Sequence, residues 1–217
     1  MGNVNKKEIG NMIKENYEYI REHLDNINKA CDNLYKKWIK EKPYFCKSDI
    51  DREELKEILN EIKETHDQSK FSEEEFEPYG ENFFGIKECN KCSKFDDCKK
   101  LGSNKNKDCK EYKYKDFDKA WEHHFKVNKH HWNHWCYNWE LNESGVPLNE
   151  CKLSIPLEMS DRYIIEMICD WTAMGYKFEN TAKEFYFLNK NKIKLNPKTR
   201  YKIELIFGME EVPKYYK

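Results

Sequence analysis

Hydrophobic side chains recur at steps of three and four over residues 6–40, which is the spacing of one face of an α-helix. Because proline cannot continue a helix and disfavours helix at the residue before it, we expect this helix to end at Lys42-Pro43. The apolar stripe consists of Ile9, Ile13, Tyr17, Ile20, Leu24, Ile27, Cys31, Leu34 and Trp38.

A second amphipathic segment follows Pro43. Ser48 is the predicted N-cap, and Asp51 takes the third helical position, where a capping box has an acid or an amide. The apolar positions of this helix end at Ile62, and His66 lies four residues further on the same face.

The same kind of pattern predicts further helices along the chain. Ser72 with Glu75 forms a capping box for a short helix that ends near Tyr79-Gly80. Another helix covers residues 116–139. Residues 140–159 are irregular, and an active-site loop and a short hairpin are the two interpretations of this segment. The last three helices begin at Ser160, at Thr181 with Glu184, and at Asn196-Pro197. We expect the first of them to end at Gly175. With at least six helices and little strand, the predicted fold class is all-α.

The composition limits the partners of the chain. Charged residues make up 36% of the sequence and aromatic residues 15%, so a polar surface surrounds an aromatic-rich core. The net charge of −1 does not favour nucleic acid as a partner. No apolar run approaches the ~20 residues that span a bilayer, and the first thirty residues contain no signal-peptide pattern. We therefore expect a cytoplasmic protein whose cysteines are thiols or metal ligands.

Residues 87–115 differ from the rest of the chain because lysine, asparagine, aspartate and cysteine dominate there. Four cysteines in a C-x2-C-x5-C-x10-C pattern predict a zinc site, since bound zinc supplies folding energy that a core-poor segment lacks. An iron–sulfur cluster and four unrelated thiols in a flexible insertion are the alternatives. We expect residues 87–115 to be an inserted knuckle in a single helical domain made of residues 1–86 and 116–217. The four cysteines are Cys89, Cys92, Cys98 and Cys109.

The segment 116–139 is rich in histidine and tryptophan. If it is one helix, the residues on its buried face include two histidines. The histidines of this segment have three possible roles: they are solvated, they stack in an aromatic core, or they bind metal or phosphate. As ligands we rank His124 and His131 first and His130 next, and we expect His123 and His134 to be exposed. The predicted face consists of Phe117, Trp121, His124, Asn128, His131 and Trp135.

Three further helices carry residues that typically bind divalent metal ions. His23 flanks the stripe of the first helix, where a packing or surface role is the alternative. His66 and Asp67 stand at the end of the second helix, and an imidazole satisfied by its neighbouring carboxylate is the alternative there. Glu166 and Asp170 lie four residues apart on a later helix, and both are solvated in the alternative reading.

The order His … His-Asp … Asp resembles the HD-domain superfamily of metal-dependent phosphohydrolases. The chain also resembles, more closely, a family of small bacterial and phage proteins of unknown function with HD-like motifs. The matching segments are 66–72 (HDQSKFS), 120–135 and 166–171 (EMICDW). The middle segment matches at Ala120, Trp121, His124, Asn128, His130, His131, Trp132 and Trp135.

The resemblance implies an HD-domain-like helical bundle that binds one or two divalent ions (Mn, Fe, Ni, Co, Mg or Zn) and hydrolyses a small phosphoester, such as a nucleotide, with metal-activated water. A non-enzymatic, metal-stabilised binding module of phage or bacterial origin is the alternative. The implied metal ligands are His23, His66, Asp67, Asp170, His124 and His131, and the implied catalytic residues are Lys70, Glu166 and His130.

Overall fold

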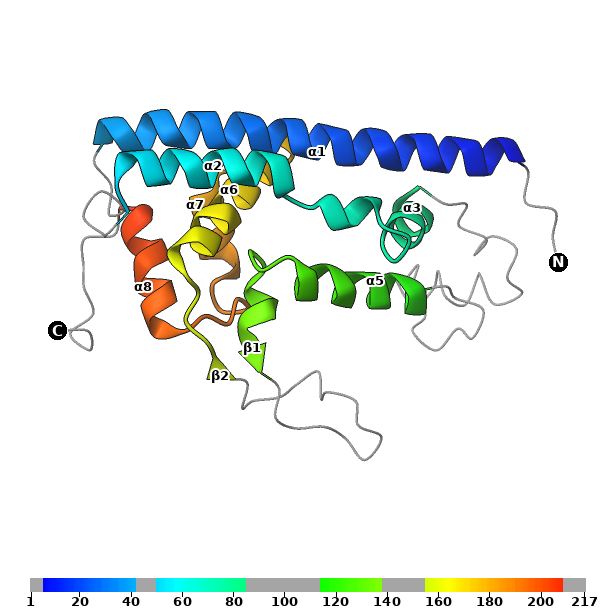
Figure 1. Cartoon of the computed structure of the whole chain (residues 1–217). Helices are drawn as coiled ribbons and strands as arrows, with labels where there is room; N and C mark the ends of the chain where they lie inside the picture. Colours follow the sequence, from blue (N-terminus) through cyan, green and yellow to red (C-terminus); the bar gives the residue numbers. More distant parts are fainter. Residues whose placement is uncertain (1–5, 42–49, 85–113, 138–154, 209–217) are drawn as a thin grey trace. The chain divides into compact units, whose positions relative to one another are not determined.

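The computed structural model describes residues 6–41, 50–84, 114–137 and 155–208. These four ranges contain seven α-helices, two short 3-10 helices and one pair of two-residue strands (Figure 1). The predicted all-α class is therefore confirmed at this level. The four cysteines of the predicted zinc knuckle lie outside the described residues. None of the described helices has both the length and the apolar composition that a bilayer-spanning segment requires.

The chain divides into two compact units. The smaller unit consists of residues 1–21 and 68–124, and the larger unit consists of residues 22–67 and 125–217. Helix α1 (Lys6–Glu41) contributes its first part to the smaller unit and its second part to the larger unit. Its apolar stripe is buried from Ile20 onward except at Leu34, which is half-buried, whereas Ile9, Ile13 and Tyr17 are exposed.

The larger unit has one continuous apolar core. The second part of α1 runs beside α2 (Arg52–Thr65), and α6 (Asp161–Phe178) packs against both α2 and α7 (Ala182–Asn189) (Figure 1). Helix α8 (Pro197–Ile206) contributes Ile203 to the same core. Half of the α6 residues are buried, nine of 18, so a polar side chain on this buried side needs a partner inside the protein. Fully buried members of the core include Trp38, Ile62, Ile164, Met167, Ile168 and Tyr186.

Helix ends in the larger unit follow the sequence in part. Thr181 and Glu184 form the predicted capping box of α7, and Asn196 caps α8 ahead of Pro197. Ser48 is not the N-cap of α2: that helix begins later, and Asp51 caps it by accepting hydrogen bonds from the backbone of Glu53 and Glu54. An aspartate next to free backbone N–H groups is a strong N-cap, which moves the start of the helix.

Gly175 does not end α6 as predicted. The helix continues to Phe178, and Glu179 in the left-handed conformation (φ 53°) ends it. Gly175 is needed there because a Cβ atom on it would lie 2.3 Å from the carbonyl oxygen of Asn180. The glycine thus allows the chain to fold back closely over the last turn of the helix.

The predicted helix 116–139 is wrong in its second half. Helix α5 (Tyr114–Val127) ends early, and a turn leads to the 3-10 helix η4 (Trp132–Trp135) and strand β1 (Cys136–Tyr137). Strand β1 pairs with β2 (Ile155–Pro156), so part of the segment predicted as irregular forms a short ribbon. His134 Nδ1–H donates to the carbonyl of Lys126, and Trp135 Nε1–H donates to that of Lys129. These side chains take the carbonyls that a longer helix would use.

The smaller unit packs mainly through aromatic rings. Besides its parts of α1 and α5 it contains η2 (Gln68–Phe71) and α3 (Phe76–Phe83). The ring of Phe117 on α5 meets those of Tyr79 and Phe83 on α3 edge-on, at centroid distances of 5.1 Å and 5.6 Å. Asn16 of α1 donates a hydrogen bond to the carbonyl of Phe76 over 2.8 Å. The predicted Ser72–Glu75 capping box is absent here, because Glu75 is itself the N-cap of α3 and its side chain makes no cap hydrogen bond.

Candidate metal centre

The end of α2 places an imidazole and a carboxylate side by side. His66 is the C-cap of α2, and its N–H donates to the carbonyl of Ile62 over 2.9 Å. Its side chain therefore stays on the buried face of the helix, as the four-residue step from Ile62 predicts. Asp67 follows with φ 53°, a left-handed backbone conformation that aspartate tolerates better than most residues. Asp67 is 2% exposed and belongs to the larger unit, so its carboxylate is buried there.

Two other helices bring ligand-type atoms to the same place. His23 Nε2 of α1 lies 3.2 Å from His66 Nε2, 3.3 Å from Asp67 Oδ2 and 3.4 Å from Asp170 Oδ1 of α6. His66 Nε2 lies 3.4 Å from Asp67 Oδ2 and 3.8 Å from Asp170 Oδ1. All four side chains belong to the larger unit, and the most exposed of them, Asp170, is only 13% exposed.

These separations suit a shared metal ion. Four atoms placed tetrahedrally at about 2.0–2.2 Å from one ion are about 3.4 Å apart. The five measured separations run from 3.2 Å to 3.8 Å around that value. The larger unit thus has a buried cluster of His23, His66 and Asp67 that could hold a metal ion, and Asp170 lies beside the two imidazoles of that cluster. We call His23, His66, Asp67 and Asp170 the first ion position.

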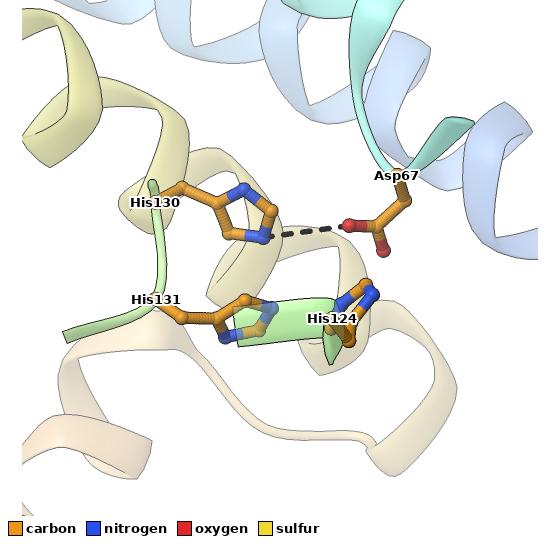
Figure 2. A group of neighbouring side chains, drawn as sticks. All are labelled: Asp67, His124, His130 and His131. Atoms are coloured by element: carbon orange, nitrogen blue, oxygen red, sulfur yellow. Dashed lines mark ion pairs between the residues drawn. The ribbon is translucent and has the colours of Figure 1, made fainter. Parts of the chain in front are cut away.

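Further ligand-type atoms lie on the other side of Asp67. Oδ1 of Asp67 is 3.5 Å from Nε2 of His130 (Figure 2). Oδ2 of the same carboxylate faces His23 and His66. The rings of His130 and His131 are neighbours with centroids 4.2 Å apart. Asp67, His130 and His131 each offer a ligand atom within 4.8 Å of the others. We call these three residues the second ion position.

Glu166 contacts one imidazole of each ion position. This residue of α6 is 6% exposed, and its Oε1 atom lies 3.1 Å from His66 Nδ1 and 3.2 Å from His130 Nδ1. Burial opposes ionisation of Glu166, but the hydrogen bonds and positive charge of His130 and His66 outweigh it and lower its pKa to about 2. The carboxylate is therefore ionised at neutral pH and accepts from both imidazoles.

The two imidazoles that share Glu166 differ in their pKa. Burial lowers the pKa of His66, and the nearby carboxylates of Asp67, Glu166 and Asp170 only partly offset this. Burial also opposes the charged form of His130, but the hydrogen bond to Glu166 and the charges of Asp67 and Asp170 prevail and raise its pKa. Protons therefore compete with a metal ion more strongly at His130 than at His66.

Comparison with known proteins places the chain in a family. A sequence model of DUF5662, a family of unknown function, matches residues 12–209. The chain belongs to this family. Searches of curated proteins and of solved structures found no match. Both ion positions lie inside the DUF5662 match, but the family description assigns them no role.

The smaller unit of this DUF5662 chain contains a second buried carboxylate with two imidazoles. His123 Nδ1–H donates to Glu75 Oε1 over 2.8 Å, and His124 Nδ1–H donates to Glu75 Oε2 over 2.7 Å. Burial opposes ionisation of Glu75, but the hydrogen bond and charge of His124 outweigh it and lower the pKa of Glu75. The ring of His124 stacks on Trp121 with a centroid distance of 5.7 Å. We call Glu75, His123 and His124 the Glu75 cluster.

The structure distributes the sequence-predicted residues over the two units. It brings together His23, His66, Asp67, His130, His131, Glu166 and Asp170 in the larger unit. His124 lies in the smaller unit with Glu75, and Lys70 is half-buried on η2 of that unit. The predicted roles of Lys70 and His124 therefore stay predictions. Sequence reasoning missed Glu75 as an imidazole partner, because its position suggested a helix cap.

Proposed function

We propose that this chain is a metal-dependent phosphohydrolase of the HD type, with an HD-like helical fold, that acts on a nucleotide or another small phosphoester. The observation that supports the proposal is the convergence of His23, His66, Asp67 and Asp170 from three segments of the larger unit. The order of these residues along the chain is the one that the HD resemblance implies.

The donor atoms suit a divalent cation. Because His66 Nδ1 faces an ionised carboxylate, that nitrogen carries the proton, and Nε2 of His66 carries a lone pair. This lone pair lies 3.4 Å from a carboxylate oxygen of Asp67 and 3.8 Å from one of Asp170. His23 Nε2 lies within 3.4 Å of all three atoms and can donate one proton to them, whereas a divalent cation among them would attract all three at once. Two imidazoles and two carboxylates suit Mn, Fe, Co, Ni or Zn.

Asp67 is central to a version with two ions. Its Oδ2 atom faces the first ion position and its Oδ1 atom faces the second. Divalent cations bound there would supply Lewis-acid chemistry, polarising a phosphoryl oxygen and lowering the pKa of water. The chain itself contributes the positioning: α1, α6 and the end of α2 hold the donors, and Glu166 orients two imidazoles.

The proposal is tested with Asp170→Asn and a matched control, Asp161→Asn. Asp161 also lies on α6, but its carboxylate binds Lys202 over 2.7 Å, so the control removes the same charge from the same helix outside the cluster. Each protein is prepared without added metal and screened on a panel of phosphoesters with Mn²⁺, Mg²⁺, Ni²⁺ and Co²⁺. We expect Asp170→Asn to lose at least about 100-fold in metal-dependent activity, and Asp161→Asn to retain it.

Ion content is measured in parallel by elemental analysis. The predicted zinc knuckle would contribute its own zinc, so ion counts are compared between variants within a Cys92→Ser background. Full phosphoesterase activity of Asp170→Asn at saturating metal contradicts the proposed mechanism. If the wild-type protein binds an ion in the cluster but hydrolyses no phosphoester of the panel, the binding module replaces the enzyme.

A further inference from the structure

We propose that Glu166 is a positioning residue that holds His66 and His130 in one tautomer and thereby couples the two ion positions. The inference rests on the metal-binding part of the proposed function, and it assigns to one carboxylate the orientation of ligands at both positions. It does not require that the reaction is phosphoester hydrolysis.

The geometry shows one acceptor atom with two donors. Oε1 of Glu166 is 3.1 Å from His66 Nδ1 and 3.2 Å from His130 Nδ1, and all three side chains are at least nine-tenths buried. The two imidazole rings lie against each other, with centroids 4.4 Å apart and planes inclined by 33°. Rings packed in this way cannot reorient independently, because each occupies the space that the other would need.

The chemistry of the contacts determines the tautomer. An ionised carboxylate only accepts hydrogen bonds, so each contact needs a proton on the histidine Nδ1. A neutral imidazole with its proton on Nδ1 has its lone pair on Nε2, which is the atom left for a metal ion. In both rings, Nε2 is the nitrogen that faces Asp67: His66 Nε2 is 3.4 Å from Oδ2, and His130 Nε2 is 3.5 Å from Oδ1.

Glu166 therefore affects both ion positions through rings that Asp67 separates. His66 belongs to the first position and His130 to the second. Loss of a carboxylate that orients a metal-binding histidine typically weakens metal binding 10–100-fold. For Glu166 we expect a loss of that size at both positions together, whereas loss of His131 should affect only the second position.

The direct test is the tautomer itself, measured in the metal-free full-length protein. Nitrogen–hydrogen NMR correlations of the imidazole rings, recorded at alkaline pH and assigned with His→Gln variants, distinguish Nδ1–H from Nε2–H. In the wild-type protein we expect His66 and His130 to carry the proton on Nδ1. In Glu166→Gln, which keeps the shape but has a weaker neutral acceptor, both rings should shift together toward the Nε2–H form. Glu61→Gln, which removes an exposed carboxylate bonded to Arg162, should leave both rings unchanged.

A wild-type protein with His66 or His130 in the Nε2–H form overturns the inference, and this result does not depend on the folding of any variant. So does a Glu166→Gln spectrum in which neither ring changes, provided that the backbone amide signals show a folded protein.

The second arm is a Mn²⁺ titration followed by electron paramagnetic resonance. Mn²⁺ is the probe because thiolates of the cysteine segment bind it poorly. We expect two Mn²⁺ ions in the wild-type protein, 10–100-fold weaker binding of both in Glu166→Gln, and weaker binding of one in His131→Asn. Unchanged affinities in Glu166→Gln contradict the inference and leave the proposed function intact. Absence of Mn²⁺ binding in the wild-type protein, with both rings in the Nδ1–H form, contradicts the proposed function and the coupling of two ion positions, and leaves only the orientation of the two rings by Glu166.

Discussion

Two buried glutamates of this chain each hold two imidazoles, and they do so in different ways. Glu166 in the larger unit uses one oxygen for both rings, whereas Glu75 in the smaller unit uses a separate oxygen for each. Around Glu166, the other nitrogen of each ring faces the Asp67 carboxylate. Within the described part of the chain, Glu75 joins no group of three ligand atoms close enough to share an ion.

The comparison shows that a buried Glu–His pair is not by itself a metal site. A carboxylate that accepts hydrogen bonds from two imidazoles satisfies its own buried charge, which is sufficient to explain the Glu75 cluster as a structural element. Two further carboxylates, those of Asp67 and Asp170, lie beside the His66 imidazole that Glu166 already binds. These extra carboxylates are what a cation would compensate.

Asp67→Asn should give the largest effect, because Asp67 contributes to both ion positions. Asparagine also tolerates the left-handed backbone of residue 67, so the local backbone conformation is kept. We expect loss of more than about 100-fold in Mn²⁺ affinity at both positions. The free energy of unfolding of the metal-free protein should stay equal or rise, because one of several neighbouring carboxylates is neutralised. Mn²⁺ titration and chemical denaturation measure the two quantities, and tight binding of either ion to Asp67→Asn would contradict the two positions as defined.

Glu75→Gln should give an effect of intermediate size, and this effect should be on folding stability rather than on metal binding. Glu75 accepts one hydrogen bond from each of two imidazoles. In the glutamine variant, one of these imidazole N–H groups would face the amide NH₂ group and lose its acceptor, which costs about 1–3 kcal/mol of stability. The first ion position contains no residue of the Glu75 cluster, so its Mn²⁺ affinity should change by less than about twofold. Denaturation and Mn²⁺ titration of the same preparation check both statements. A stable variant with impaired binding at the first position would remove the distinction between the two glutamates.

The smallest effect concerns pH. Folding raises the pKa of His130 above the ordinary histidine value of 6.5, so protons compete with an ion there already at pH values above 6.5. The pKa of His66 is lowered, so protons compete with an ion at His66 only at pH values below 6.5. As pH falls from about 8.5 to 5.5, the second position should lose Mn²⁺ first, by roughly tenfold per pH unit once His130 binds protons. Mn²⁺ titrations at several pH values measure this, with His131→Asn identifying the second position. Equal pH dependence of both positions would show that the two imidazoles do not differ in this way.

Helices and single ligand-type residues were largely predictable, because they follow from local spacing. His66 is buried since it lies four residues after Ile62. Thr181 and Asn196 cap helices that begin at the next residue, so each cap is adjacent in sequence to the turn that it caps. The bend after Val127 was not predictable from spacing. Aromatic residues at steps of three and four suit a helix, but here His134 and Trp135 fold back to bind carbonyls of the preceding segment.

The partners within the clusters depend on contacts that are distant in sequence. Glu166 is 100 residues from His66, and Glu75 is 48 residues from His123. A glutamate three residues after a serine suggests a capping box, and nothing local indicates that the side chain is buried against two imidazoles instead. Which of the histidines between residues 123 and 134 joins the ion positions was open for the same reason, and the structure brings His130 and His131 to Asp67.

The central claim is that His23, His66, Asp67 and Asp170 hold one divalent ion. Crystals of the full-length protein soaked in Mn²⁺ and measured for anomalous scattering test it directly. We expect one anomalous peak within direct bonding distance of His23 Nε2, His66 Nε2, Asp67 Oδ2 and Asp170 Oδ1. Well-ordered side chains that are hydrogen-bonded to one another, with no anomalous peak among them at saturating Mn²⁺, would contradict a shared ion.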